Sequence, residues 1–309
     1  MLSGNIFLTG GTGSLGKAIL ARASMEKWPA KFTVFSRDEV KQSELRAIYP
    51  RVKFLLGDIR DYEWLSIALR GHDTIIHAAA YKQVPAAEVN AGEAIETNVI
   101  GSRNVVRAAI TCGVDYVLGI STDKACAPIN CYGETKALME KLFQQANLLS
   151  ETKFTLVRYG NVLGSRGSVI PLFRKQVKEG RITLTDPNMT RFWLTLTDAV
   201  NLVIAGLAPN MCRGDILIPK AKASTMLMLA NVIGPETPVD VIGIRPGEKV
   251  NECLVHGGES MHTVELKDGF IIKPAYLGYK GNLQAGYEYT SDTAEQLTDS
   301  DLQKMVLEA

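Results

Sequence analysis

Short apolar runs alternate with amphipathic, helix-like stretches along the first half of the chain. The apolar runs are short enough for buried strands, and the stretches between them are long enough for helices. The predicted strands are Asn5–Thr9, Lys31–Phe35, Val52–Leu56, Thr74–His77, Asp115–Ile120 and Lys153–Arg158. The predicted helices are Gly16–Met25, Tyr62–Leu69, Glu93–Cys112 and Tyr132–Leu148. This alternation predicts an α/β fold in which helices cover both faces of a parallel sheet.

The pattern becomes irregular after Tyr159. Further helices are expected at Leu172–Glu179, Thr197–Leu207, Ala221–Val232 and Ser300–Leu307. We therefore expect a Rossmann-like, doubly wound domain in residues 1–160, rejoined by about residues 192–215. Residues 161–309 are expected to form mainly a smaller C-terminal domain that binds substrate. Because ligands bind beyond the carboxyl ends of strands in such sheets, the residues after each strand should carry the function.

Composition narrows the class of protein. The chain of 309 residues holds 34 Lys and Arg against 33 Asp and Glu, which argues against an electrostatic nucleic-acid binder. No apolar run approaches the roughly 18 residues that span a bilayer, so we expect a soluble, cytoplasmic protein without a membrane span. Five scattered cysteines suit reduced thiols, and four dispersed histidines suggest no metal site.

A glycine-rich loop follows the first predicted strand. Its spacing fits Gly-x-Gly-x-x-Gly, in which glycines permit a tight turn and the close approach of a pyrophosphate. The N-terminus of the following helix then stabilises the anion. The loop residues expected to bind a dinucleotide are Gly10, Thr12, Gly13, Ser14, Leu15 and Gly16.

The residues that end the next strands indicate which dinucleotide binds. Ser36, Arg37 and Lys41 favour NADP, because an arginine accommodates a 2′-phosphate, whereas Asp38 keeps NAD open through the ribose hydroxyl. The residues after the third and fourth strands are expected to contribute to the same dinucleotide site. They offer an acid suited to the adenine amino group, an apolar residue that can cover the ring, and small residues that admit the cofactor. These are Asp58, Ile59, Ala78 and Ala80.

The segment Ser121–Lys136 carries the candidate chemistry. Tyr132 and Lys136 are four residues apart and share one face of a helix. A nearby ammonium would lower the pKa of the phenol, so that Tyr132 can take a hydroxyl proton while Lys136 holds the nicotinamide ribose. The hydroxyls of Ser121 and Thr122 would close the proton relay.

The adjacent pair Asp123 and Lys124 adds elimination to this redox chemistry. Oxidation of a sugar hydroxyl to a ketone acidifies the neighbouring C–H bond. Lys124 would take that proton as a base, provided that burial and nearby positive charge lower its pKa. Asp123 would protonate the leaving hydroxyl, which requires a raised pKa.

At this point the chain resembles the extended short-chain dehydrogenase/reductase superfamily. Within it, the chain is similar to the polysaccharide-biosynthesis branch that contains inverting UDP-N-acetylglucosamine 4,6-dehydratases, the first enzymes of pseudaminic acid synthesis. The matching segments run over nearly the whole chain: Thr9–Ser14, Phe35–Glu39, His77–Ala80, Ser121–Ala125, Arg158–Pro171, Met189–Trp193 and Gly243–Lys249. Where relatives read Leu-Lys-His-Val-Pro, this chain reads Tyr81-Lys82-Gln83-Val84-Pro85, which puts fine substrate contacts in doubt.

The resemblance implies a redox-neutral, NADP-dependent dehydration of UDP-N-acetylglucosamine with inversion at C5, for surface or secreted glycans. Lys124 would be the C5 base and Asp123 the acid at C6, while Tyr132, Lys136 and Thr122 would serve oxidation at C4. Residues that would line the sugar-nucleotide site are Lys82, Asn161, Arg166, Val169, Thr185, Arg191, Arg245 and Glu248. Arginines suit a diphosphate because they donate bidentate hydrogen bonds.

Three alternatives remain open. Retaining 4,6-dehydratases usually carry Asp-Glu after the threonine, and C4-epimerases usually carry small residues there, so Asp123-Lys124 departs from both. An epimerase or an epimerising dehydratase is the enzymatic alternative. A non-catalytic NADP-sensing regulator is the alternative of another class, although such proteins typically lose the tyrosine–lysine pair.

The resemblance also implies a homo-oligomer, a dimer or larger, formed through helices Glu93–Cys112 and Tyr132–Leu148.

Overall fold

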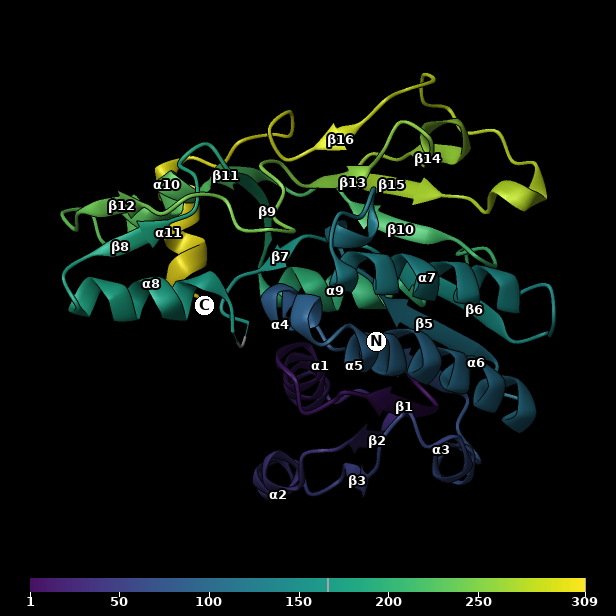
Figure 1. Cartoon of the computed structure of the whole chain (residues 1–309). Helices are drawn as coiled ribbons and strands as arrows, with labels where there is room; N and C mark the ends of the chain where they lie inside the picture. The colour runs from purple at the N-terminus through teal and green to yellow at the C-terminus, as the bar shows by residue number, and fades with distance from the viewer. Residues whose placement is uncertain (166, 309) are drawn as a thin grey trace.

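A computed structural model describes residues 1–165 and 167–308. Its main element is a nine-stranded sheet in the order β14-β15-β10-β6-β5-β4-β1-β2-β3 (Figure 1). The strands from β10 to β3 pair in parallel, whereas β15 pairs antiparallel with β10 and β14 pairs antiparallel with β15. The order β3-β2-β1-β4-β5-β6 is that of a doubly wound dinucleotide-binding sheet, so the predicted α/β fold class is confirmed.

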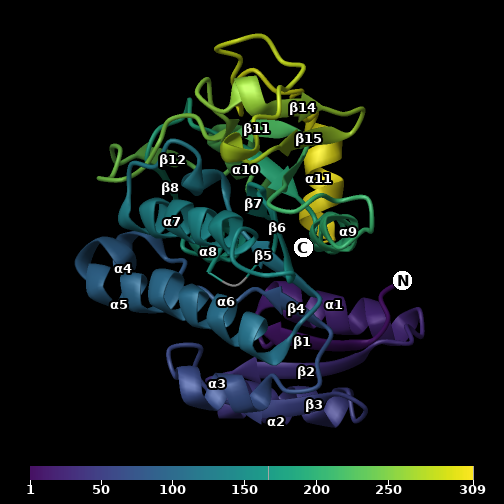
Figure 2. The same cartoon turned by 90° about the vertical axis from the view of Figure 1, so that its right-hand side faces the viewer.

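The sheet strands are β1 (Asn5–Thr9), β2 (Lys31–Ser36), β3 (Lys53–Leu56), β4 (Thr74–His77), β5 (Tyr116–Ile120), β6 (Lys153–Val157), β10 (Ile216–Pro219), β14 (Thr263–Glu265) and β15 (Gly269–Ile272). The helices beside them are α1 (Ser14–Met25), α2 (Glu39–Ile48), α3 (Tyr62–Ala68), α4 (Val84–Val89), α5 (Ala91–Ile95), α6 (Gly101–Cys112), α7 (Cys131–Ala146) and α9 (Leu196–Gly206). Figure 2 shows α3, α6 and α7 on one face of the sheet and α1 with α9 on the other. The central strands are buried on both faces because helices cover each side.

The remaining elements form a second group at one side of the sheet (Figure 1). They are β7 (Asn161–Val162), α8 (Val169–Lys178), β8 (Ile182–Leu184), β9 (Thr190–Leu194), β11 (Ala223–Thr225), α10 (Met226–Ile233), β12 (Val239–Val241), β13 (Cys253–Val255), β16 (Tyr289–Thr290) and α11 (Asp299–Leu307). A separate apolar cluster, which includes Phe173, Trp193 and Leu229, lies among α8, α10 and α11.

Helix α9 packs against α1, and β10, β14 and β15 lie in the main sheet. Residues beyond the predicted return at 192–215 therefore also belong to the nine-stranded sheet. The division into two domains at residue 160 stays a prediction. In the described part of the chain, no helix is long and apolar enough to cross a membrane.

Three details differ from the pattern-based expectation. The predicted helix Glu93–Cys112 is interrupted by a π-helical turn at Glu96–Ile100 between α5 and α6. The predicted helix at Ala221–Val232 is wrong at its start, because β11 pairs with β9 there and Thr225 then caps α10. Helix α2 was not predicted; Asp38 begins it by accepting a hydrogen bond from the Lys41 backbone N–H.

Candidate active site

A cavity of about 1030 Å³ lies beyond the carboxyl ends of the parallel strands. It brings together most residues that the sequence singled out. Those lining it are Gly10, Thr12, Gly13, Ser14, Leu15, Gly16, Ser36, Arg37, Lys41, Asp58, Ile59, Ala78, Ala80, Lys82, Thr122, Asp123, Lys124, Tyr132, Lys136, Asn161 and Val169. Four predicted substrate residues, Thr185, Arg191, Arg245 and Glu248, are not part of this lining. Arg166 lies outside the described residues.

The glycine loop is shaped for a close ligand. Gly10 has φ +67°, and a Cβ there would lie 2.7 Å from the backbone N of Ala79. A Cβ on Gly16 would lie 2.4 Å from Cα of Gly11, so only glycine lets α1 approach the turn. Gly13 precedes the first residue of this twelve-residue helix, whose N-terminus faces the cavity. The helix dipole and the backbone at the start of α1 fit a pyrophosphate.

The far end of the cavity is rich in charge. Asp38 caps α2 and pairs with the amine of Lys41. Arg37, half-exposed, lies 3.4 Å from the Asp58 carboxylate. Partial burial disfavours the Asp58 charge, but hydrogen bonds from Arg60 hold the pKa of this carboxyl below its usual value. Asp38, the acid that could bind a ribose hydroxyl, is thus engaged in capping α2, and the guanidinium of Arg37 lies at the rim of the cavity.

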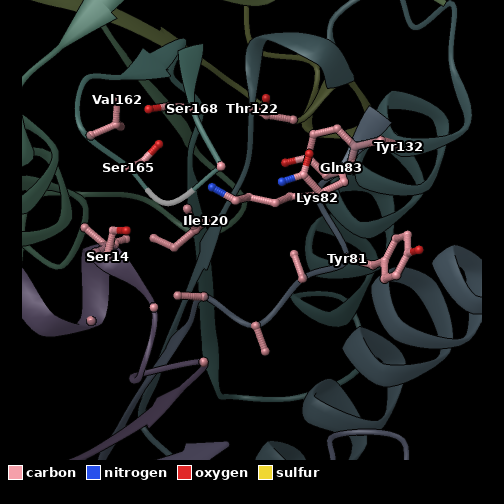
Figure 3. A pocket seen from close by; sticks show the side chains of 18 of the residues that line it. Ser14, Tyr81, Lys82, Gln83, Ile120, Thr122, Tyr132, Val162, Ser165 and Ser168 are labelled. Carbon is pink, nitrogen blue, oxygen red and sulfur yellow. The ribbon is translucent and has the colours of Figure 1, made fainter. Parts of the chain in front are cut away.

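The chemical groups converge from two neighbouring elements. Thr122 and Asp123 follow β5, and Tyr132 and Lys136 lie in the first two turns of α7, which Asn130 caps. The Thr122 hydroxyl donates to Oδ1 of Asp123 at 2.8 Å and lies close enough to the Tyr132 phenol to favour a lower pKa of that phenol. In Figure 3, Tyr132 and Thr122 lie on one side, and Lys82 extends toward the loop that carries Ser165 and Ser168.

Ser121 does not take part in this convergence. Its hydroxyl donates to the buried carboxylate of Glu140 at 2.6 Å, which leaves Thr122 as the member of the predicted hydroxyl pair that lies near Tyr132. Lys136 donates to the carbonyl of Ile120 at 2.6 Å and contacts Sδ of Met139 at 2.8 Å.

The protonation states of the acid and base depend on burial. Burial raises the pKa of Asp123, although the positive charge of the neighbouring Lys124 opposes this shift. A raised pKa is what an acid at the leaving hydroxyl requires. The expectation of a lowered Lys124 pKa is wrong. Burial does disfavour its charge, but the carboxylates of Asp123 and Glu252 outweigh burial and raise the pKa of Lys124.

The phenol also differs from expectation. Burial raises the pKa of Tyr132 to about 12, and the positive charge that opposes this is on Lys124 rather than Lys136. Burial lowers the pKa of Lys136 itself to about 7. Lys136 therefore does not lower the pKa of Tyr132, because its amine hydrogen-bonds the carbonyl of Ile120 and not the phenol.

The substrate side of the cavity has unpaired polar atoms. Oδ1 of Asn161 and Oγ of Ser168 are buried and accept or donate no hydrogen bond within the described residues. Arg191, in contrast, is already used: its guanidinium donates to the carbonyls of Thr190, Val250 and Lys249. Arg245 and Glu248 form an ion pair at 2.6 Å on the loop after β12.

The comparisons with known proteins agree with this site. Residues 6–274 match the family model described as "Polysaccharide biosynthesis protein". The chain belongs to this family. A relative from Campylobacter jejuni, named UDP-N-acetylglucosamine 4,6-dehydratase (inverting), is 41% identical over 94% of this chain and 93% of its own length. A Rickettsia conorii relative, named UDP-glucose 4-epimerase, is 44% identical over 86% of this chain and 82% of its own length.

A solved structure of the same fold, Pen from Bacillus thuringiensis, superposes with a TM-score of 0.91 at 36% identity. The match covers 99% of this chain and 97% of that one. The two names given to relatives in this polysaccharide-biosynthesis family are those of a dehydratase and an epimerase, so family membership alone does not choose between the reactions.

Sequence reasoning missed several residues at the site. Tyr159 and Ser168 line the cavity, and the rule that strand ends carry function could have found Tyr159, which follows β6. Glu252 contacts Lys124 although it is far away in the sequence, and no motif marks it. Among residues 1–165 and 167–308, no group of three or more His, Cys, Asp or Glu side chains could hold a metal ion.

Proposed function

We propose that this protein dehydrates UDP-N-acetylglucosamine to a UDP-2-acetamido-2,6-dideoxy-4-keto-hexose, inverts C5, and leaves its nicotinamide cofactor unchanged overall. One observation supports this most strongly: Asp123 and Lys124 share a cavity with Tyr132, Lys136 and the glycine loop. Redox chemistry alone needs only the last three. An acid and an amine beside them are what an elimination adds.

The residues present fit a dinucleotide. The glycine loop and the N-terminus of α1 would hold the pyrophosphate, and Asp58 with Ile59 would face the adenine. Arg37 and Lys41 support NADP over NAD, because Asp38 is engaged in capping α2. When bound, the nicotinamide accepts a hydride from the sugar and later returns it.

Tyr132 would accept the proton of the C4 hydroxyl during oxidation. Thr122, which lies near the phenol, would help to orient it, and Lys136 lies one helical turn further along the same face. Asp123 would then protonate the C6 hydroxyl, which leaves as water. Its raised pKa, caused by burial, supports the protonated form that this step needs.

Lys124 would remove the C5 proton once C4 is a ketone. Its amine lies 3.1 Å from Asp123 Oδ1, which supports a base and an acid that act on neighbouring carbons of the sugar. The carboxylate of Glu252 beside it favours its ammonium form even when Asp123 is protonated, so the amine must lose a proton before it can act. Asn161, Ser168 and Lys82 would contact the sugar nucleotide from the opposite side. The roles of Thr185, Arg191, Arg245 and Glu248 in binding stay predictions.

The second candidate is a UDP-hexose 4-epimerase, which the name of the Rickettsia relative favours. An epimerase oxidises C4 and returns the hydride to the other face of the same carbon. It has no use for an acid and a base at C5 and C6. Asp123 and Lys124 therefore support dehydration over epimerisation.

The deciding experiment is incubation with NADP in deuterium oxide, using UDP-N-acetylglucosamine in one sample and UDP-glucose in another. Dehydration predicts loss of one water molecule by mass spectrometry and solvent deuterium at C5 by NMR. Epimerisation predicts an isomer of unchanged mass with no deuterium at carbon. Lys124→Ala should abolish water loss, whereas Lys141→Ala, an exposed lysine on the same helix as Tyr132, should not.

Two further proposals concern context. We place the reaction at the start of a pseudaminic acid-type route to surface or secreted glycans, in the cytoplasm. We also propose a homo-oligomer formed through α6 and α7, because Ile95, Leu138 and Leu148 are exposed on or beside these helices. Light scattering of the purified protein tests the oligomer.

A further inference from the structure

Glu252 is a buried carboxylate that contacts the candidate base from a distant part of the chain. Its Oε1 lies 3.1 Å from Nζ of Lys124 and 3.7 Å from Nε of Arg191. Its side chain is 3% exposed. Its second oxygen, Oε2, is buried and has no hydrogen-bond partner within residues 1–165 and 167–308. A buried charge with an unpaired oxygen is costly, so its presence here calls for an explanation.

The position of Glu252 is fixed by its backbone. Its N–H donates to Oγ of Ser291 at 2.9 Å, and the N–H of Ser291 donates back to its carbonyl at 2.8 Å. The hydroxyl of Thr190 hydrogen-bonds the same Ser291 oxygen at 2.6 Å. Strand β13 begins directly after Glu252 and strand β16 ends directly before Ser291, and the two strands pair with each other. The carboxylate therefore reaches Lys124 from a rigid support.

Three charged groups act on the pair of Lys124 and Glu252, namely Asp123, Arg191 and Lys249. Lys249 is turned away and donates to the carbonyl of Cys126 at 2.6 Å. Burial disfavours the Glu252 charge, but Lys124 and Arg191 together hold its pKa below the usual value. At rest the pair is thus a carboxylate and an ammonium.

This resting state creates a chemical requirement. Lys124 can take a proton from C5 only as a free amine. Its side chain is 20% exposed, at the cavity, so a sugar nucleotide that fills the cavity would cover it and keep solvent from accepting its proton. Its two hydrogen-bond partners are Asp123 and Glu252, each at 3.1 Å. Asp123 must carry a proton of its own in order to release water from C6. That leaves Glu252 to receive the proton of Lys124, and because the pKa shifts of both groups favour the ion pair, this transfer is the uphill step that the substrate complex has to promote.

We propose that Glu252 is the proton acceptor that converts Lys124 from an ammonium into the C5 base. One N–H bond of Lys124 breaks, one O–H bond forms on Oε1 of Glu252, and the two charges cancel. The free amine then takes the C5 proton while Asp123 gives its proton to the leaving C6 hydroxyl. When the ammonium of Lys124 reprotonates C5, the amine is free again and Glu252 returns its proton to it, and Asp123 regains a proton from solvent. Glu252 acts through Lys124 and is a positioning residue, and this inference rests on the proposed dehydration.

The test compares Glu252→Gln with Glu252→Asp. Glutamine keeps the size and an acceptor oxygen but cannot take up a proton. We expect Glu252→Gln to lower water loss and C5 deuteration about 100-fold or more, in the range for loss of acid–base catalysis. Oxidation at C4 should persist, seen as transient absorbance of reduced nicotinamide, because Tyr132 and Lys136 are intact. Glu252→Asp, which retains a carboxylate, should recover part of the dehydration.

Other outcomes overturn the inference. If Glu252 only stabilises the ammonium, its removal makes Lys124 easier to deprotonate. The acidic limb of the pH–rate profile of Glu252→Gln would then move to lower pH with neutral turnover unchanged or higher. Should Glu252→Gln fail to fold, Glu252→Asp decides: a loss as complete as that of Lys124→Ala refutes the role.

Failure of the inference and failure of the proposed function give different results. Wild-type protein that loses no water from UDP-N-acetylglucosamine refutes the dehydratase proposal. Wild-type protein and Glu252→Gln that dehydrate equally refute the role of Glu252 alone. Glu295→Gln is the matched control, because Glu295 pairs with Lys222 on the surface away from the cavity. Its dehydration rate should equal that of wild type.

Discussion

Arg158 donates two hydrogen bonds to the carboxylate of Glu259, one of 2.8 Å from Nη1 and one of 2.7 Å from Nη2. The same guanidinium donates to Glu140 on α7, at 3.0 Å and 2.7 Å. Arg158 is fully buried at the end of β6. One side chain thus joins the sheet, the helix that carries Tyr132, and the C-terminal segment that follows Glu252. The bidentate geometry makes this connection directional.

We expect Arg158→Met to lower the free energy of unfolding by about 3 to 5 kcal/mol, because it leaves two buried carboxylates without their cation. Arg158→Lys should lose less, since it retains the charge but not the fork. Arg181→Met removes an arginine whose ion pair with Asp240 is exposed, and should cost no more than about 1 kcal/mol. Chemical denaturation followed by circular dichroism measures all three. Equal losses at Arg158 and Arg181 would contradict the structural role.

His77 should make stability depend on pH. Its ring is buried, hydrogen-bonded to Thr9 and Ser102 on its two nitrogens, and burial together with nearby Lys136 lowers its pKa from 6.5 to about 3. Below about pH 6.5 the unfolded chain takes up a proton that the folded ring refuses, so stability falls as the pH falls. From about pH 7.5 to about pH 5 the contribution of this one group is a loss of about 2 kcal/mol.

The variant that tests this is His77→Gln. Its unfolding free energy should change less with pH between those two values than that of wild type, whatever its absolute stability. His262→Gln is the control, because that ring is partly exposed and should leave the wild-type slope unchanged. An unchanged slope in His77→Gln would show that other groups cause the acid sensitivity.

Lys136 should contribute to function at the expense of stability. Burial lowers its pKa from 10.5 to about 7, so the folded protein gains stability as the pH rises from about 7 toward 10 and loses it on the way down. We expect Lys136→Met to raise the unfolding free energy at neutral pH by up to about 4 kcal/mol, and to abolish that slope. C4 oxidation should fall at the same time. Lys141→Met, exposed on the same helix, should change neither.

The parts of this molecule that could be predicted from sequence are those determined locally. Strand Asn5–Thr9 and the glycines after it are specified by neighbouring residues, and the structure places them as expected. Helix α2 was overlooked because its apolar face is narrow, although Asp38 gives a capping signal. The start of the predicted helix at Ala221 was wrong because pairing with β9 overrides a helical pattern.

The charge state of the site required the tertiary structure. Sequence placed Asp123 beside Lys124, but nothing in the chain marks Glu252 as the second carboxylate, which together with Asp123 raises the pKa of Lys124. The orientation of Lys136 toward the Ile120 carbonyl is likewise set by packing. Spacing on a helix predicts which residues share a face, whereas their pKa values depend on contacts from other elements.

The preference for NADP is tested at Arg37, which stands at the cavity rim beyond β2. A charge-assisted hydrogen bond from this guanidinium to a 2′-phosphate is worth enough that Arg37→Ser should weaken NADP binding about 10- to 100-fold. Binding of NAD, which lacks that phosphate, should change little, because the pyrophosphate is held at the glycine loop. Isothermal titration calorimetry with both dinucleotides measures the ratio of the two affinities.

The control is Arg46→Ser, on the exposed face of α2 and outside the cavity lining, which should leave both affinities unchanged. Equal weakening of NADP and NAD by Arg37→Ser, or a wild-type preference for NAD, would show that Asp38 rather than Arg37 selects the cofactor.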